Sequence, residues 1–464
     1  MDLLEKFAPI GILLVIVAFV IARLPRIELG HSEAFRRRRV LNWLPLGLTY
    51  AFLYMGRYNL TVAKDAFGKM MDNSDFATIF AAGTITYGAS FIINGPLTDR
   101  YGGKFSILVG SAGAAVCNLI MGFATLALYD GNEFVQSNFI LLFSILYAVN
   151  MYFQSFGAVA IVKCNAPWFH VRERGVFGAI FGILISLGIY FAFDIGFLIV
   201  RSLDVQWVFF VPAVLLAIFW VIDVFMVRNT PGEAGHDDFD TADASSGDDG
   251  PQLGAVAVFK LMLSQPIIVT IALIEFCSGF LRQAIMQWYR TFAKQVGATD
   301  SFVYDNWGML LCCAGIMGGV VAGIISDRVF QSRRGPVAGL LYATMLVGSF
   351  VMIFTYQSAL LGPLVILLSM AVIGVHGMLS GTASMDFGGR KNVGVAVGII
   401  DGFVYAGTGF MSIIYGVLLP NGEAAKSADN WLVWPVTMVP VAAIGLYLAR
   451  RVWNARPSQA AAKA

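Results

Sequence analysis

The sequence predicts an all-α protein that crosses a membrane many times, and three observations predict this class. Of 464 residues, 58% are hydrophobic and only 13% are charged, which is far more apolar than an ordinary soluble domain. The hydrophobic residues fall into runs of about 20, the length of helix that spans the hydrocarbon core. Short basic clusters lie between these runs, as the cytoplasmic loops of a membrane protein require.

The first apolar run covers residues 7–22 and follows Asp2, Glu5 and Lys6. A signal peptide begins with a basic flank, so this mixed flank favours a retained transmembrane helix. Twelve further runs are long enough to span. They cover 42–66, 76–98, 104–128, 137–164, 174–200, 206–229, 265–295, 303–326, 336–357, 359–383, 393–419 and 431–450.

The basic clusters set the expected orientation, because Lys and Arg accumulate in cytoplasmic loops. Each cluster follows the first run or an even-numbered run of the twelve. This pattern predicts an inner (plasma) membrane protein with its N-terminus outside and its C-terminus in the cytoplasm. The clusters are Arg36 to Arg39, Arg100 with Lys104, Arg172 with Arg174, Arg328 with Arg333 and Arg334, Arg390 with Lys391, and Arg450 with Arg451.

Residues 229–250 read NTPGEAGHDDFDTADASSGDDG and contain few large apolar side chains. This composition predicts a disordered acidic linker on the cytoplasmic side, between two bundles of six helices. The expected domains are an extra helix and basic linker (1–40), an N-terminal bundle (41–229), the acidic linker (230–258), a C-terminal bundle (259–452) and a tail (453–464).

A short motif occurs twice, after the second and the eighth of the twelve runs. GPLTDRYGGK contains Gly95, Asp99 and Arg100, and GIISDRVFQSRRG contains the corresponding Gly323, Asp327 and Arg328 at an offset of 228 residues. A single DR pair at a helix end is often only a basic flank, but two copies in register favour an internal repeat. Asp and Arg at these positions are candidates for pairing across a gate.

Two arginines are predicted near the middle of the membrane, where an ionisable side chain needs a partner or a purpose. Arg57 lies in the first of the twelve helices and Arg282 in the seventh, so a repeat axis would place them across one cavity. Two guanidinium forks suit a tetrahedral oxyanion. Tyr50 and Tyr54 share a helix face with Arg57 and are candidate hydroxyl donors. The alternatives are arginines satisfied by structural acids and tyrosines that only pack.

Five other ionisable residues in the helices have more than one interpretation. Glu275 is a candidate partner for Arg282, or it lies nearer the membrane surface. Lys163 is a third cation or a snorkelling lysine. Asp401 pairs with an arginine or carries a proton. Asp194 does one of these two things, or it lies near the outer surface. His376 is a proton carrier or, more often for such a residue, a hydrogen-bonded packing residue.

Other classes of function find little support in the sequence. The net charge of +2 gives no argument for nucleic acid, and no phosphate-cradling loop for ATP is present. The five cysteines have neither metal-site nor disulfide spacing. We therefore expect no metal, no cofactor and no catalytic group, hence not an enzyme.

Several segments resemble the organophosphate:phosphate antiporter family of the major facilitator superfamily. They are YAFLYMGRYNL, FLRQAIMQWYRTFAKQV, CAGIMGGVVAGIISDRVFQSRRG and GVAVGIIDGFVYAGTG. The resemblance implies a major facilitator fold of two six-helix bundles, to which this chain adds one N-terminal helix. It also implies that Arg57 and Arg282 clasp a substrate phosphate, while Tyr50, Tyr54 and Tyr405 line the same cavity.

The sequence departs from the family pattern at five positions. Phe91 stands where a lysine is expected, and Pro167 where a histidine is expected. Gln287 and Cys312 replace acidic residues, and Asp401 occupies a glycine position. The two arginines remain while their surroundings differ, so the resemblance implies phosphate recognition more firmly than any particular substrate.

These observations predict a carrier that exchanges an organic phosphate for inorganic phosphate by rocking of its two halves. Two alternatives stay open: proton symport of an organic carboxylate through Asp401 or Glu275, and a receptor or scaffold that keeps the fold without transport. The expected partners are a small anion and the lipid bilayer. The chain is expected to be a monomer, with a membrane partner possible for the extra helix.

Overall fold

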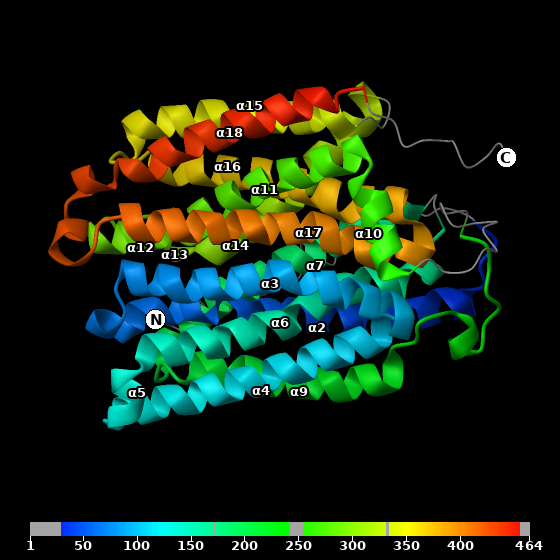
Figure 1. The fold of residues 1–464 in the computed structure, drawn as a ribbon, viewed down its shortest axis with the longest axis horizontal. Helices are drawn as coiled ribbons and strands as arrows, with labels where there is room; N and C mark the ends of the chain where they lie inside the picture. Colours follow the sequence, from blue (N-terminus) through cyan, green and yellow to red (C-terminus); the bar gives the residue numbers. More distant parts are fainter. Residues whose placement is uncertain (1–28, 171–172, 242–253, 331–333, 455–464) are drawn as a thin grey trace.

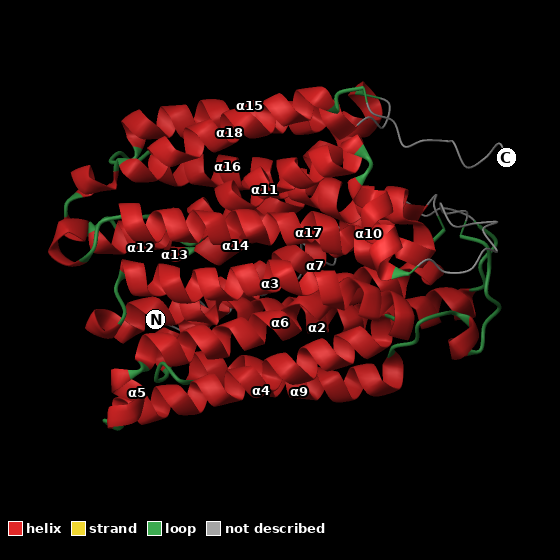
Figure 2. Cartoon of the chain, in the orientation of Figure 1, coloured by secondary structure: helices red, strands yellow, loops and turns green. Residues whose placement is uncertain are grey.

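The computed structural model describes residues 29–170, 173–241, 254–330 and 334–454. Across these ranges every regular element is a helix (Figure 2). The extra helix predicted at 7–22 and the tail lie outside the described residues, apart from the first two residues of the tail. Ten helices in the described ranges are long and apolar enough to cross a membrane, and Trp307–Gly323 is a shorter apolar helix. The chain is therefore a multi-pass membrane protein.

The N-terminal half begins with α2, and a π-helical segment, η4 (Phe191–Ile195), joins α7 to α8. Its helices are α2 (Glu33–Phe67), α3 (Asn73–Tyr101), α4 (Gly103–Tyr129), α5 (Glu133–Ser137), α6 (Phe139–Asn165), α7 (Arg174–Tyr190), α8 (Gly196–Ser202) and α9 (Trp207–Met226).

The C-terminal half contains two further π-helical segments, η6 (Ile325–Val329) and η7 (Gly377–Ala383). Its helices are α10 (Ala255–Leu263), α11 (Pro266–Met286), α12 (Tyr289–Gln295), α13 (Phe302–Asp305), α14 (Trp307–Ile324), α15 (Arg334–Thr355), α16 (Leu361–His376), α17 (Ser384–Leu418) and α18 (Val433–Arg451).

Local signals explain where several helices begin. The Ser32 side chain accepts a hydrogen bond from the backbone N–H of Phe35 and caps α2. Asp72 and Asp75 form a reciprocal capping box at the start of α3, and Pro266 occupies the first turn of α11. Because Ser32 caps α2, the helix includes the basic residues 36–39 and begins nine residues before the apolar run predicted at 42–66.

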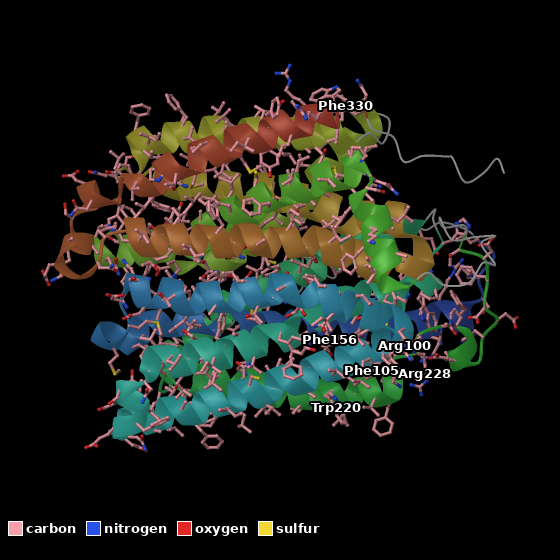
Figure 3. The ribbon with its side chains drawn as sticks, viewed as in Figure 1. Arg100, Phe105, Phe156, Trp220, Arg228 and Phe330 are labelled. Atoms are coloured by element: carbon pink, nitrogen blue, oxygen red, sulfur yellow. The ribbon has the colours of Figure 1, made fainter. Side chains whose placement is uncertain are left out.

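The two halves lie side by side and meet along α3 and α17 (Figure 1). At one end of the molecule α2 begins, α9 ends and α10 lies; we call this the linker end. The opposite end holds residues 68–72, 130–138, 296–306 and 419–432, and we call it the loop end. Figure 3 shows Arg100 and Arg228 towards the linker end.

Glycine permits the close approach of α3 and α17. A Cβ atom on Gly95 of α3 would lie 2.8 Å from the carbonyl oxygen of Gly394 on α17. A Cβ on Gly394 would lie 2.7 Å from the carbonyl oxygen of Gly95. Small residues at helix contacts in membranes let two backbones come together in this way.

The predicted disorder of residues 230–258 does not hold for residues 230–241. A short 3₁₀ helix, Gly232–Ala234, follows α9, and the Asp238 carboxylate accepts a hydrogen bond from the Gly232 N–H. Phe239 packs its ring against Phe35 of α2. Residues 255–258 belong to α10, while residues 242–253 lie outside the described part. The acidic composition of this segment gave no signal from which these local contacts could be predicted.

Candidate functional site

Arg57 is almost fully buried, with 1% of its surface exposed, and lies where the two halves meet. Its Nη1 donates a hydrogen bond to the Tyr405 hydroxyl of α17 at 2.5 Å, and its Nη2 donates to Gln154 of α6 at 3.5 Å. The guanidinium carbon lies 4.5 Å from the ring centre of Tyr54 and 4.7 Å from that of Tyr87. Aromatic faces attract such a cation, so these rings stabilise the buried charge.

A polar network fixes the backbone of α2 around this arginine. The Tyr147 hydroxyl donates to the carbonyl of Arg57 at 2.7 Å, and the Asn150 amide donates to the carbonyl of Gly56 at 2.9 Å. Asn118 links Asn150 to Asn59 through hydrogen bonds of 3.1 and 2.5 Å. These buried bonds hold α2 against α4 and α6, so Arg57 has a defined position.

Arg282 of α11 is also buried, with 5% of its surface exposed. Within the described ranges it forms no hydrogen bond, and its Nε is a buried donor without a partner. It interacts electrostatically with Tyr58, Tyr405 and Tyr54. Tyr54 and Tyr405 contact Arg57, and both also lie within electrostatic range of Arg282.

Neither arginine forms an ion pair with a carboxylate among the described residues. Glu275, one predicted partner of Arg282, instead lies with its Oε2 2.9 Å from Nδ1 of His376. Asp401 accepts a hydrogen bond from the Ser380 hydroxyl. Both acids still interact electrostatically with Arg282, but without direct contact. The positive charge of the two guanidinium groups therefore has no bonded counterion within the described ranges.

Tyr50 also belongs to the group of aromatic side chains next to Arg57, because it packs against Tyr54. Its ring meets the Tyr54 ring edge-on at 5.4 Å and stacks on Phe181 of α7 at 5.8 Å. It is 3% exposed and interacts electrostatically with Arg57 and Tyr405. The structure therefore places all three predicted tyrosines around Arg57.

Lys163 belongs to a different part of the molecule. Its Nζ forms an ion pair of 2.6 Å with Asp99, near the linker end of α3. Asp99 lies twelve residues along α3 from Tyr87, which is about 18 Å of helix rise. Lys163 therefore forms this ion pair at the linker end, and a role for it as a third cation of the arginine site stays a prediction.

Asp99 also joins the two halves. Its carboxylate accepts hydrogen bonds from the backbone N–H groups of Gly394 and Val395 on α17, both at 3.2 Å. Arg100 is exposed and its guanidinium lies over the ring of the neighbouring Tyr101, and it makes no such bridge to a described residue. The second copy of the motif lies in η6, but the side chains of Asp327 and Arg328 lie outside the described part.

A second set of contacts joins the halves towards the loop end. Gln283 of α11 donates to the Tyr58 hydroxyl at 2.8 Å, and Thr61 of α2 donates to Gln287 at 2.6 Å. Asn73 and Gln295 exchange two hydrogen bonds of 3.0 Å. Polar contacts between the halves thus occur on both sides of the arginines.

The structure also describes the surroundings of other residues that the sequence singled out. Asp194 accepts hydrogen bonds of 2.7 Å from the N–H groups of Gly308 and Met309 at the start of α14. Cys312 lies in an apolar cluster with Tyr190, and Phe91 packs against Tyr87. Pro167 lines a cavity with Lys163 near the linker end.

Sequence reasoning missed Gln154, Tyr87 and Tyr58. Gln154 and Tyr87 lie in mid-run positions of two predicted helices, and Tyr58 follows Arg57 directly. Gln154 is a polar residue in an apolar run, and this signal could have singled it out. The Gln154 Nε2 and Tyr87 hydroxyl atoms are buried without a hydrogen-bond partner within the described ranges.

Residues 46–414 match the Major Facilitator Superfamily, and the chain belongs to this family of membrane transporters. A bacterial homolog of the human lysosomal transporter Spinster has the same fold, with a TM-score of 0.64 over 91% of this chain and 98% of that one, at 14% identity. A D-xylose–proton symporter gives a TM-score of 0.61 at 14% identity, over 89% of this chain and 97% of that one.

Among curated proteins, the chain is similar to the glycerol-3-phosphate transporter of Bacillus subtilis (strain 168). The two are 26% identical over 459 residues, which cover 91% of this chain and 94% of the other. It is also 22% identical to the membrane sensor protein UhpC of Escherichia coli (strain K12), over 87% of this chain and 89% of that one. A probable hexose phosphate transport protein of Chlamydia pneumoniae is 22% identical, over 94% of this chain and 97% of that one.

Proposed function

We propose that this transporter exchanges an organic phosphate for inorganic phosphate across the bacterial inner membrane by alternating access. The observation that carries this proposal is the pair of buried guanidinium groups. Arg57 and Arg282 come from different halves, share Tyr54 and Tyr405 as electrostatic neighbours and have no bonded carboxylate among the described residues. An oxyanion is the ligand that such a pair lacks.

The free energy of charge burial supports an anionic substrate. A charged side chain at bilayer depth costs at least about 2.5–3.5 kcal/mol on insertion scales. Two arginines without bonded acids therefore carry a cost that a bound dianion offsets. A phosphate group matches the planar fork of arginine, which donates two parallel hydrogen bonds to two oxygens.

The contacts on the two sides of the arginines support alternating access. On the linker side, Asp99 bonds to the backbone of α17. On the loop side, Thr61 bonds to Gln287. A carrier of this type opens one set of contacts at a time, and an anion that neutralises both arginines lowers the barrier to the closed intermediate.

The atoms beside Arg57 support an organic group that carries hydroxyls. The Gln154 amide and the Tyr87 hydroxyl are buried with unused hydrogen-bonding capacity in the described part. A buried polar group of this kind is usually satisfied by a partner. Glycerol phosphate and hexose phosphates, which the relatives' names mention, are therefore the proposed substrate class.

Exchange in proteoliposomes tests the proposal. Vesicles loaded with inorganic phosphate should take up labelled phosphate, and external glycerol 3-phosphate should compete. Replacing either Arg57 or Arg282 by lysine should lower the exchange rate at least about tenfold, because lysine lacks the two-pronged fork.

Arg290 provides the matched control. It is a buried arginine outside this site that packs over Phe197 and donates to the carbonyl of Tyr304. Arg290→Lys should keep most of the exchange activity. Wild-type exchange rates in both Arg57→Lys and Arg282→Lys would contradict the proposal.

A receptor for the same ligand is a second candidate, because two curated relatives are named as membrane sensor proteins. A receptor binds the organic phosphate in detergent but does not exchange it in vesicles. Binding that is lost in Arg57→Lys, without any exchange by the wild type, would favour this candidate over a carrier.

A further inference from the structure

Three titratable side chains from three helices lie together in the C-terminal half. They are Glu275 of α11, His376 of α16 and Asp401 of α17, which are 0%, 8% and 7% exposed. His376 Nδ1 lies 2.9 Å from Glu275 Oε2, and Asp401 interacts electrostatically with both of these residues. We call these three residues the acid–histidine cluster.

The cluster has unused hydrogen-bonding capacity. Glu275 Oε1 is buried and has no hydrogen-bond partner in the described part of the chain. A buried carboxylate oxygen is normally satisfied, either by a donor or by a proton of its own. Glu275 Oε1 can therefore carry a proton that is separate from the one shared between Glu275 Oε2 and His376.

Among the described residues, no Lys or Arg forms an ion pair with Glu275 or Asp401. The Tyr342 hydroxyl donates to the carbonyl of Ile274, and Arg334 donates to the carbonyl of Met378 in η7. In the described part of the chain, the titratable or charged side chains that interact electrostatically with a member of the cluster include Cys277 and Arg282 of α11, Tyr342 of α15, Tyr87 of α3 and Tyr50 of α2.

Glu275 and Asp401 are carboxyl groups that interact electrostatically with Arg282 without bonding to it. A phosphate dianion at Arg57 and Arg282 would add two negative charges to a region from which water is excluded. Uncompensated buried charge is strongly unfavourable, so anion binding favours a protonated cluster.

We propose that Glu275, His376 and Asp401 form a proton-binding site that takes up a proton when a phosphate dianion binds at Arg57 and Arg282. The proton comes from water, adds to a carboxylate oxygen or to the imidazole, and returns to water when the anion leaves. Exchange of two dianions then moves no net proton, whereas net uptake of one dianion carries a proton with it. This inference rests on the proposed function.

Proton counting by calorimetry tests it on the purified full chain. Glycerol 3-phosphate is titrated at about pH 8, where a phosphate monoester of second pKa about 6 is already a dianion. The heat is measured in two buffers that differ in ionisation enthalpy. The wild type should take up about one proton per anion bound, and its affinity should fall as pH rises, because the protonated form binds better.

Neutral substitutions imitate the protonated cluster. Asp401→Asn and Glu275→Gln should each raise the affinity at about pH 8 and lower the proton count. The expected gain in affinity is roughly tenfold, because binding that takes up one proton changes about tenfold in affinity per pH unit. Asp223→Asn is the matched control, because Asp223 is a buried carboxylate of α9 that accepts a hydrogen bond from Thr49 at 2.6 Å. It should keep the wild-type proton count.

The outcomes separate this inference from the proposed function. If the wild type binds the ester without proton uptake, the inference is wrong and the proposed function stands. An unchanged proton count in both Asp401→Asn and Glu275→Gln also overturns it, because the proton then binds elsewhere. If these variants do not fold, the wild-type count and its pH dependence still decide. A wild type that binds no phosphate compound overturns both proposals.

Discussion

The aromatic rings beside Arg57 determine how a guanidinium group can remain in the middle of a membrane protein. Tyr54 and Tyr87 present their ring faces to the cation, and Tyr405 accepts its shortest hydrogen bond from the other half of the molecule. Rings stabilise the charge without competing as bonded anions do. The guanidinium therefore keeps donors for a ligand.

Two substitutions of Tyr54 distinguish the contribution of its ring to phosphate binding from that of its hydroxyl. In the described ranges this hydroxyl forms no hydrogen bond, whereas the ring lies 4.5 Å from the Arg57 guanidinium. A cation–π contact is worth about 0.5–2 kcal/mol, so Tyr54→Leu should weaken phosphate binding roughly two- to thirtyfold. Tyr54→Phe should stay within about twofold. Calorimetric affinities check this, and equal losses in both variants would show that the hydroxyl binds the anion.

Some residue-scale features could be predicted from sequence and others could not. The depth of Arg57 and Arg282 in their apolar runs predicted that both are buried, and helical spacing predicted that Tyr54 lies beside Arg57. The bond between Glu275 and His376 could not be predicted, because it depends on how α11 and α16 rotate against each other. The same holds for Lys163, whose partner Asp99 comes from a different helix.

At the scale of elements, the approach of α3 to α17 depends on glycine. A methyl group at Gly95 would lie 2.8 Å from the carbonyl oxygen of Gly394. Gly95→Ala should therefore push the helices apart at the linker end and lower the midpoint of thermal unfolding in detergent. Gly182→Ala is the control, because a Cβ there meets nothing within 4 Å, and alanine favours a helix over glycine. A midpoint in Gly95→Ala that equals that of the control would contradict this assignment.

Apolar runs predicted most helix bounds to within a few residues, because helix length in a membrane is set by the bilayer. Two predicted runs are not single α-helices, and the hydropathy pattern contains no signal for these interruptions. The run over 265–295 divides into α11 and α12 near Gln287, and the run over 174–200 contains the π-helical segment η4. A count of twelve core helices and one extra helix stays a prediction.

At the scale of the whole molecule, the arginine pair predicts exchange rather than net flow. An empty carrier must bring Arg57 and Arg282 through the closed state without a dianion between them. Efflux from phosphate-loaded vesicles into anion-free medium should therefore be at least about tenfold slower than exchange, equal to a barrier about 1.4 kcal/mol higher. Equal rates at about pH 8 would show that the empty protein returns as readily as the loaded one.

The central claim is that one guanidinium group from each half binds the same phosphate. Calorimetric titration of glycerol 3-phosphate into the wild type, Arg57→Lys, Arg282→Lys and the double variant tests it most directly. We predict one anion per chain, a loss of at least about tenfold in each single variant, and a double variant that loses less than the product of the two. Wild-type affinity in either single variant, or strictly multiplicative losses, would contradict a shared site.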